Sequence, residues 1–222
     1  MRLKAAVIFL LFVFLSFPVA AAEYIDGAIR LVLHEETGRF SLFSQRHQDN
    51  RGRPLALFFN QDPRTSFLSV MVNDRVFRMG DSSAFRTRIG GTEREPSLIF
   101  ESSFMLVTKE FSFVSSPGSA ETNGVSIRIT LENRGDRQVL AGARFLLDTQ
   151  LSEGRGGITF ATDRRTFSSE TLLSRGDGDR FWIDRNDTLS LTGSLFTGSD
   201  TDPDSVHFAN WKRLNDASFR VP

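Results

Sequence analysis

Three carboxylates at alternate positions form the most evident candidate for cation binding. Asp200, Asp202 and Asp204 lie in one polar stretch. Calcium takes oxygen ligands from loops of this composition, so these residues are candidate calcium ligands. The helix-loop-helix calcium motif is absent, because its glycine is missing and Trp211 stands where the motif ends in glutamate. A polar turn is the simpler interpretation, so we expect no cofactor and keep calcium as the alternative.

Two further pairs of acidic residues are candidates for chemistry. Asp177 and Asp179 form a second, weaker calcium alternative. Asp148 and Glu153 follow a predicted strand, and they would be the catalytic carboxylates if the protein processed carbohydrate. The chain has no nucleophile elbow, no zinc-protease motif and no phosphate-binding glycine loop. We therefore expect no enzymatic activity, with a carbohydrate-active protein as the alternative.

A histidine beside two glutamates is the best acid–base cluster in the sequence. His34 precedes Glu35 and Glu36 near a predicted turn. Successive residues of a strand point to opposite faces, so at most one of the two glutamates joins the histidine. A solvated turn is the simpler interpretation of this cluster.

Aromatic and arginine residues near the C-terminal end predict a contact surface. His207 alternates onto the same strand face as Trp211, and Arg213 follows closely. Tryptophan and arginine are the residue types that anchor interfaces, so these three residues and Trp182 are the predicted binding residues. Core packing is the simpler interpretation of Trp182, which lies between phenylalanine and isoleucine.

One lysine interrupts an apolar strand face. Lys109 alternates in phase with Val107 and Phe111. Either it pairs with a carboxylate at the sheet edge, or a bulge near Thr108 turns it outward. We favour the bulge, because a buried lysine without a partner is costly.

The elements that position these residues are strands. Period-two alternation runs through Val125–Glu132 and again through Val139–Leu147, with the polar turn Asn133–Arg137 between them. This pattern predicts a long hairpin. No window shows the periodicity and caps of a long helix. We therefore predict an all-β, antiparallel β-sandwich with little or no helix.

Other alternating runs complete the predicted sandwich. They are Ile29–Leu33 with Phe40–Phe43, Leu68–Val72 with Val76–Met79 across Asn73-Asp74, Ser97–Glu101, Phe104–Val114, Leu189–Leu195 and Val206–Trp211. The turn-rich stretches Ser115–Gly124 and Thr197–Ser205 are predicted loops. The last predicted strand leaves an edge that sandwiches usually cover, so we expect a final strand to be lacking.

The N-terminal segment is typical of an export signal. Arg2 and Lys4 precede an apolar run from Ala5 to Phe17, and small residues end at Ala22. This is the three-part secretory pattern, and its apolar run is short for a membrane span. We expect cleavage near Ala22, with residues 1–22 as signal peptide and 23–222 as one domain. The protein would then be extracytoplasmic, either periplasmic or secreted.

Charge and cysteine content narrow the classes of partner. The 27 basic and 27 acidic residues balance, and loss of the signal would leave a net charge of −2. Nucleic acid is therefore not an expected partner, because phosphate binding needs a concentrated positive field. The chain has no cysteine, which excludes disulfides and thiol catalysis.

Two stretches carry a resemblance to a known fold. The run Gly124–Asp136, followed by Ala141–Thr149, resembles strands of large bacterial extracytoplasmic sandwiches of the galactose mutarotase-like supersandwich type. Ile29–Phe43 looks like the first hairpin of such proteins. The resemblance implies a fold and a glycan or envelope context. The catalytic histidine and glutamate of that family find no matching motif here, so it implies no activity.

These observations lead to one expectation and its competitors. We predict an exported, non-enzymatic binding or structural module of the bacterial periplasm or cell envelope. Its partner would be an envelope protein or a glycan. A carbohydrate-binding or carbohydrate-active protein is the main alternative. A subunit of a larger envelope assembly that pairs through exposed strand edges is the third.

Overall fold

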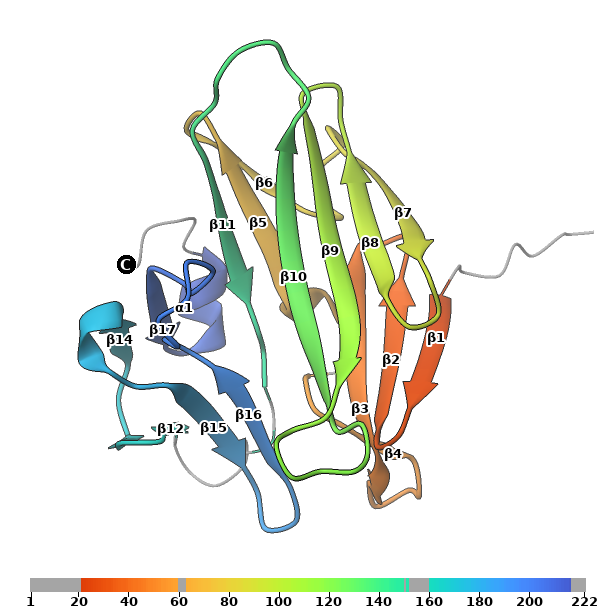
Figure 1. Cartoon of the computed structure of the whole chain (residues 1–222), viewed down its shortest axis with the longest axis vertical. Coiled ribbons are helices and arrows are strands. Elements are labelled where there is room, and N and C mark those ends of the chain that lie inside the picture. The colour runs from red at the N-terminus through yellow and green to blue at the C-terminus, as the bar shows by residue number, and fades with distance from the viewer. Residues whose placement is uncertain (1–20, 60–62, 150, 152–159, 217–222) are drawn as a thin grey trace, which may run out of the picture.

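The computed structural model describes residues 21–59, 63–149, 151 and 160–216 (Figure 1). These residues form seventeen strands, two 3-10 turns (Pro63–Thr65 and Arg175–Asp177) and one short helix. All strand pairs are antiparallel, so the predicted all-β antiparallel class is confirmed.

Two four-stranded sheets are simple meanders. One contains β1 (Ala21–Asp26), β2 (Ile29–His34), β3 (Arg39–Gln48) and β4 (Pro54–Ala56) in that order. The other has the order β10-β9-β8-β7 and contains β7 (Arg86–Gly91), β8 (Pro96–Glu101), β9 (Met105–Val114) and β10 (Gly124–Asn133). Strands β1 and β10 are therefore edges of their sheets.

A third sheet joins segments that are distant in the sequence. Its order is β11-β5-β6, with β5 (Phe67–Val72), β6 (Arg75–Arg78) and β11 (Ala141–Leu146). The predicted hairpin across Asn73-Asp74 is confirmed as β5 and β6. Both turn residues have positive φ, 46° and 64°, which matches a two-residue hairpin turn.

The C-terminal part forms two smaller sheets. One has the order β13-β12-β15-β16, from β12 (Phe160–Thr162), β13 (Thr166–Phe167), β15 (Phe181–Arg185) and β16 (Ser190–Ser194). The other pairs β14 (Thr171–Ser174) with β17 (Ser205–Phe208). The helix α1 (Trp211–Asp216) follows.

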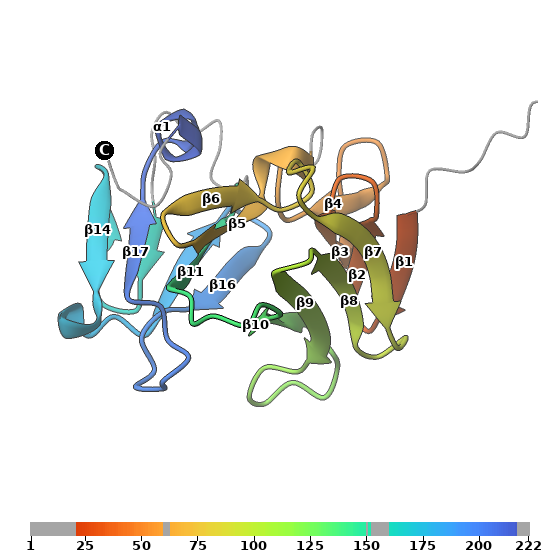
Figure 2. The same cartoon turned by 90° about the horizontal axis from the view of Figure 1, so that it is seen from above.

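The large sheets are not clearly two stacked layers. Four antiparallel sheets of three or four strands follow one another around the molecule, in the manner of a four-bladed propeller (Figure 2). Their shared core draws buried side chains from β2, β3, β5, β8 and β9. A second core lies between the small sheets and consists of Phe167, Leu173, Leu195, Phe196 and Phe208.

The predicted long hairpin of two neighbouring runs is wrong. β10 pairs along its whole length with β9, from Gly124↔Val114 to Asn133↔Met105. β11 pairs with β5 in another sheet. Period-two alternation fixes which side chains face the core, but it does not choose the neighbouring strand. The connection between the two runs therefore crosses from one sheet to another.

The predicted strand Val206–Trp211 ends early. β17 stops at Phe208, and Trp211 begins α1. Asn210 starts this helix, because its side-chain oxygen accepts the Lys212 backbone N–H at 3.0 Å and its carbonyl accepts the Leu214 N–H. The alternation of β17 extends in the sequence as far as Trp211, so the pattern predicted a longer strand and did not indicate Asn210 as a helix cap.

The predicted signal peptide lies mostly outside the described residues. Ala21 and Ala22 are described and pair in β1 with His34 and Leu33. Cleavage after Ala22 would leave the remaining four pairs of β1 with β2, from Glu23↔Val32 to Asp26↔Ile29. Within the described ranges, no helix is long and apolar enough to cross a membrane.

A glycine contact locks the turn between β2 and β3 against the end of β6. Gly80 has φ of +87°, and a Cβ at this position would overlap the Thr37 carbonyl and approach the Arg39 guanidinium. Gly118 has a similar φ of +82°, but it faces open space. The two glycines therefore separate the effect of backbone strain from that of steric overlap.

We expect Gly80→Ala to lower the free energy of unfolding by about 3 kcal/mol, since strain and overlap combine. Gly118→Ala should lower it by about 1 kcal/mol through strain alone. Urea denaturation of both variants measures the difference. Equal losses would show that the Gly80 contact does not constrain the fold.

Candidate functional site

The lysine on the apolar face of β9 is fully buried. Lys109 has 0% exposure. The register is unbroken on both sides of it, with Leu98 of β8 and Ile129 of β10 as its cross-strand partners. The predicted bulge near Thr108 is therefore wrong, and regular alternation carries the lysine inward with Val107 and Phe111.

Aromatic rings surround the Lys109 amine. Its Nζ lies 5.1 Å from the ring centre of Phe40, 5.4 Å from that of Phe145, 5.9 Å from that of Phe111 and 6.0 Å from that of Phe100. The Nζ atom has no hydrogen-bond partner among the described residues. Ring faces attract a cation, but they replace only part of its lost hydration.

Burial strongly favours the neutral form of this amine. Loss of solvent, followed by the positive charge of Arg39, lowers the pKa of Lys109 from 10.5 to about 7. Arg39 is also fully buried, but it is compensated. Its guanidinium donates to the Thr37 and Met79 carbonyls and forms an ion pair of 3.0 Å with Asp81. Among the described residues, no anion does the same for Lys109.

Beside this lysine, β10 presents an open backbone edge. The Arg134 N–H donates to the Phe104 carbonyl at 3.0 Å, which makes this a hydrogen-bonded pair. Such pairs alternate in antiparallel ladders, so the even-numbered residues of β10 bond to β9. The amides and carbonyls of Val125, Ile127, Ile129 and Leu131 therefore point away from β9, where no described strand pairs with them.

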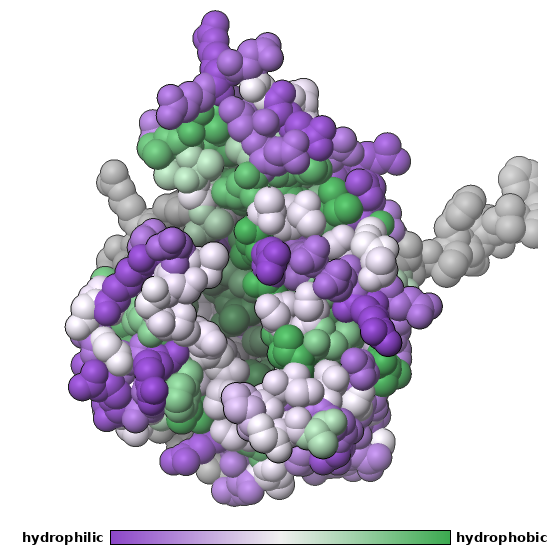
Figure 3. All heavy atoms as spheres, viewed as in Figure 1, coloured by the Kyte–Doolittle hydropathy of each residue, from purple (hydrophilic) through white to green (hydrophobic). Residues whose placement is uncertain are grey.

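The edge of β11 faces the same space. The Asn73 N–H donates to the Leu140 carbonyl, so the even-numbered residues of β11 bond to β5 and the odd-numbered ones point away. Figure 1 shows β10 and β11 as neighbouring strands that the loop at the top of the view connects. A hollow with apolar walls lies in this region of the surface (Figure 3).

We call this hollow the apolar slot. The segments of this region carry apolar side chains that pack on the first core but remain only half-buried: Val125, Ile127, Ile129 and Leu131 of β10, Val139, Phe145 and Leu147 in and beside β11, and Leu189 and Leu191 at β16. Ile129 and Phe145 both adjoin Lys109, the first as its cross-strand partner and the second as one of its rings. The buried amine therefore lies behind Ile129 and Phe145, enclosed by the rings.

The predicted contact residues near the C-terminus are held by local contacts. The Trp211 indole N–H donates to the Thr65 carbonyl at 2.9 Å. Arg213 forms an ion pair of 2.6 Å with Glu170. His207 pairs with Leu172 in the β14–β17 ladder, and burial lowers its pKa. These contacts hold α1 and β17 in place, and the predicted binding role of the three residues stays a prediction.

Trp182 packs against the second core, in line with the simpler interpretation of this residue as a core side chain. It lies on β15, is half-buried and contacts the second core. Its indole covers Gly193, its cross-strand partner, so closely that a Cβ on that glycine would overlap the ring. Both tryptophans are half-buried and make contacts within the fold, and their predicted role in binding stays a prediction.

The two candidate catalytic carboxylates cannot be compared as a pair. Asp148 is half-buried beside β11. Its backbone N–H donates to the Ser66 hydroxyl, and its backbone carbonyl accepts the Phe59 N–H. Glu153 lies outside the described residues. The catalytic alternative for these two positions stays a prediction.

Among the candidate calcium ligands, Asp202 accepts hydrogen bonds from residues of its own loop. Asp202 accepts the backbone N–H groups of Thr197, Gly198 and Ser199 and the Thr197 hydroxyl. Asp204 is fully exposed, 3.8 Å from Arg175. Across the described ranges, no three acidic or histidine side chains are grouped in a way that could hold a metal ion. The loop is closed by its own hydrogen bonds, as the polar-turn interpretation predicts.

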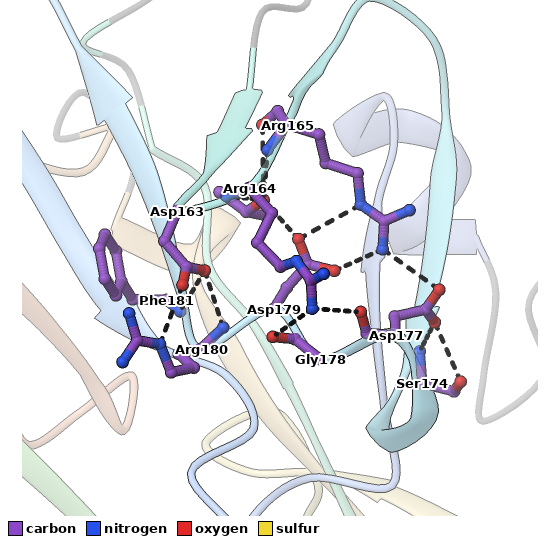
Figure 4. Close-up of polar contacts among 10 residues, drawn as sticks. Asp163, Arg164, Arg165, Ser174, Asp177, Gly178, Asp179, Arg180 and Phe181 are labelled. Atoms are coloured by element: carbon purple, nitrogen blue, oxygen red, sulfur yellow. Dashed lines mark hydrogen bonds and ion pairs between the residues drawn. The ribbon is translucent and has the colours of Figure 1, made fainter.

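Asp177 and Asp179 belong to a clasp between strands (Figure 4). Asp179 is fully buried and pairs with Arg165, which also reaches Asp177 at 3.2 Å. The Thr162 hydroxyl donates to Asp179 as well. Hydrogen bonds from Arg165 are the main cause that lowers the pKa of Asp179, while burial opposes them. Other described residues thus supply hydrogen bonds to both carboxylates.

The histidine cluster is also structural. The His34 Nε2 lies 3.0 Å from the Ser41 hydroxyl on the neighbouring strand. Glu35 and Glu36 line a shallow recess with Gly80, Phe85 and Thr87. Burial lowers the pKa of His34, which favours its neutral form in this hydrogen bond.

Comparisons with protein-family models, curated proteins and solved structures found no match. The resemblance to mutarotase-like sandwiches therefore stays a prediction. The candidate site rests on the geometry of Lys109 and the apolar slot. The sequence carried one signal for it, which was a lysine in phase with the apolar face of β9.

The buried amine predicts a stability that depends on pH. Between pH 7 and 10.5 the unfolded chain holds the Lys109 proton and the folded chain releases it. Stability should therefore rise with pH through this range, by up to about 1.4 kcal/mol per pH unit, and be lowest below pH 7. Lys109→Met should remove this slope and be more stable than wild type at pH 7.

Chemical denaturation between pH 6 and 10 measures the difference between the variants. Lys212→Met is the matched control, because Lys212 is exposed on α1. The control should keep the slope of the wild type. A Lys109→Met variant with an unchanged slope would contradict a neutral buried amine.

The clasp predicts a large effect at one aspartate and a smaller one at its neighbour. Asp179→Ala leaves the inner end of Arg165 and Thr162 without an acceptor, so we expect a loss of at least about 2 kcal/mol. Asp177→Ala removes a half-buried carboxylate that pairs with the same arginine and accepts the Ser174 N–H and hydroxyl, and it should cost less than the loss of the fully buried Asp179. Thermal unfolding of both variants tests this order, and the reverse order would rule out the clasp.

Proposed function

We propose that this protein is an exported, non-catalytic binding module of the periplasm or cell envelope, and that it binds an extended segment of a partner protein along β10. One observation carries the proposal. β10 is a ten-residue edge strand with no described strand on its outer side, and the apolar slot runs beside it.

Strand addition uses what this edge offers. A bound segment exchanges main-chain hydrogen bonds with the edge and places alternate side chains in adjoining pockets. On β10 the free amides and carbonyls belong to Val125, Ile127, Ile129 and Leu131. Their side chains are also the half-buried residues of the slot. An apolar residue at every second position of the segment would complete the core at this place.

In the described part of the chain, β10 lacks several of the usual protections of an edge strand. Natural sheets guard exposed edges with proline, bulges, inward charges or very short strands. β10 contains no proline, its register with β9 is continuous, and its core-facing residues are uncharged. The other edge of the third sheet, β6, has only four residues. A long unprotected edge fits a surface that pairs with another chain.

The finer prediction of a sandwich belongs to the same proposal. Phe40 of β3 packs against Phe111 of β9 with ring centres 5.1 Å apart, and against Phe145 of β11 at 6.0 Å. The sheet β10-β9-β8-β7 thus faces β3 and β11 across the shared core. A strand inserted between β10 and β11 would join these two layers at one side.

A proline on the open edge tests strand addition. Ile129→Pro removes an outward N–H and leaves the ladder to β9 intact, whereas Ile129→Ala only shortens the side chain. The probe is a short capped peptide of alternating valine and threonine with a central glutamine, followed by fluorescence anisotropy. We expect the proline variant to bind at least about tenfold more weakly than the alanine variant.

Circular dichroism confirms that both variants fold. Ile127→Pro, which blocks another outward amide, repeats the test should Ile129→Pro be unfolded. Proline variants that bind the peptide as well as Ile129→Ala would contradict strand addition at this edge. The absence of peptide binding by the wild type would contradict it as well.

A further inference from the structure

A buried lysine beside the apolar slot has no counter-ion among the described residues. Lys109 is fully buried, and its Nζ has no hydrogen-bond partner among the described residues. The charged group that acts on it is Arg39, which is also positive. The carboxylate of Asp81 pairs with that arginine, so it does not compensate the lysine.

We propose that the segment bound along β10 carries a carboxylate, from an aspartate or glutamate side chain, that pairs with the Lys109 Nζ. This inference rests on strand addition as the function of the slot. It adds the chemical class of the partner, which is an apolar, extended segment with one acidic residue facing the core.

The register fixes where that acidic residue must lie. Lys109 and Ile129 are directly opposite each other, and by the alternation on β10 they form a non-hydrogen-bonded pair. Side chains of such pairs lie close together on the same face. Phe145 of β11 approaches the amine from the other side of the slot. A segment between β10 and β11 therefore meets Lys109 at the residue level with Ile129.

Electrostatics make a carboxylate the favoured group at this position. A buried charge without a partner is costly, and pairing it with a hydrogen-bonded carboxylate offsets part of that cost. A glutamine of the same shape leaves the lysine without a counter-charge. A lysine in the segment adds a third positive charge beside Lys109 and Arg39. The site therefore discriminates by charge at one position and by apolar fit at the flanking positions.

Pairing with a carboxylate also changes the protonation of the lysine. The free amine is largely or partly neutral above pH 7, because its pKa is lowered to about 7. An adjacent carboxylate favours the ammonium form, so binding takes up a proton at mildly alkaline pH. A ligand without the carboxylate causes no such uptake.

The experiment compares three capped valine–threonine peptides that differ only at the central residue, which is glutamate, glutamine or lysine. We expect wild type to bind the glutamate peptide at least about tenfold more tightly than the glutamine peptide, and the lysine peptide most weakly. Lys109→Met should bind the glutamate and glutamine peptides equally. Lys212→Met should keep the wild-type preference.

Calorimetry in two buffers of different ionisation enthalpy gives the second readout. We expect proton uptake for the glutamate peptide with wild type, and none with Lys109→Met or with the glutamine peptide. Tight binding of glutamate and glutamine peptides with equal affinity would overturn the carboxylate anchor and leave strand addition standing. Absence of binding by any of the peptides would overturn both proposals.

Discussion

A single uncompensated amine is the constraint around which the first core is organised. Lys109 occupies the middle of β9, where regular alternation carries it inward. Four rings from β3, β8, β9 and β11 enclose it, so three sheets meet at this one side chain. A methyl-ended side chain would fill the space at lower cost. The retained charge is therefore the feature of the core that packing alone does not explain.

Arg39 and Lys109 are the two buried charged residues of this core, and they differ in how their charge is compensated. Arg39 is as deeply buried as Lys109, yet carbonyls and Asp81 satisfy it. The turn at Gly80 brings those carbonyls to the guanidinium. Lys109 has no comparable set, and it lies beside the open edges of β10 and β11. A counter-charge that arrives with a bound strand accounts for both the open edge and the unpaired amine.

Period-two alternation predicted the faces of the strands well and their partners poorly. It identified β5 and β6 with their turn, because Asn73-Asp74 is a local signal of chain reversal. The same alternation wrongly predicted that β10 pairs with β11. The true partner of β11 is β5, about seventy residues earlier in the sequence, and no local sequence signal indicates a pairing over that distance. Trp211 and Asp202 were prominent in the sequence, but contacts within the fold occupy them. Lys109 was noticed, and only the continuous register showed that it points inward.

The most direct test of this account is the titration of the lysine side chains by heteronuclear NMR. The chain has three lysines, so selective labelling resolves Lys109 from Lys4 and Lys212. We expect the free protein to show one lysine with a midpoint near pH 7. Adding the glutamate peptide should raise this midpoint by at least about one pH unit, because the ammonium gains a counter-charge. A Lys109 midpoint near 10.5 in the free protein, or one that the peptide leaves unchanged, would contradict the account.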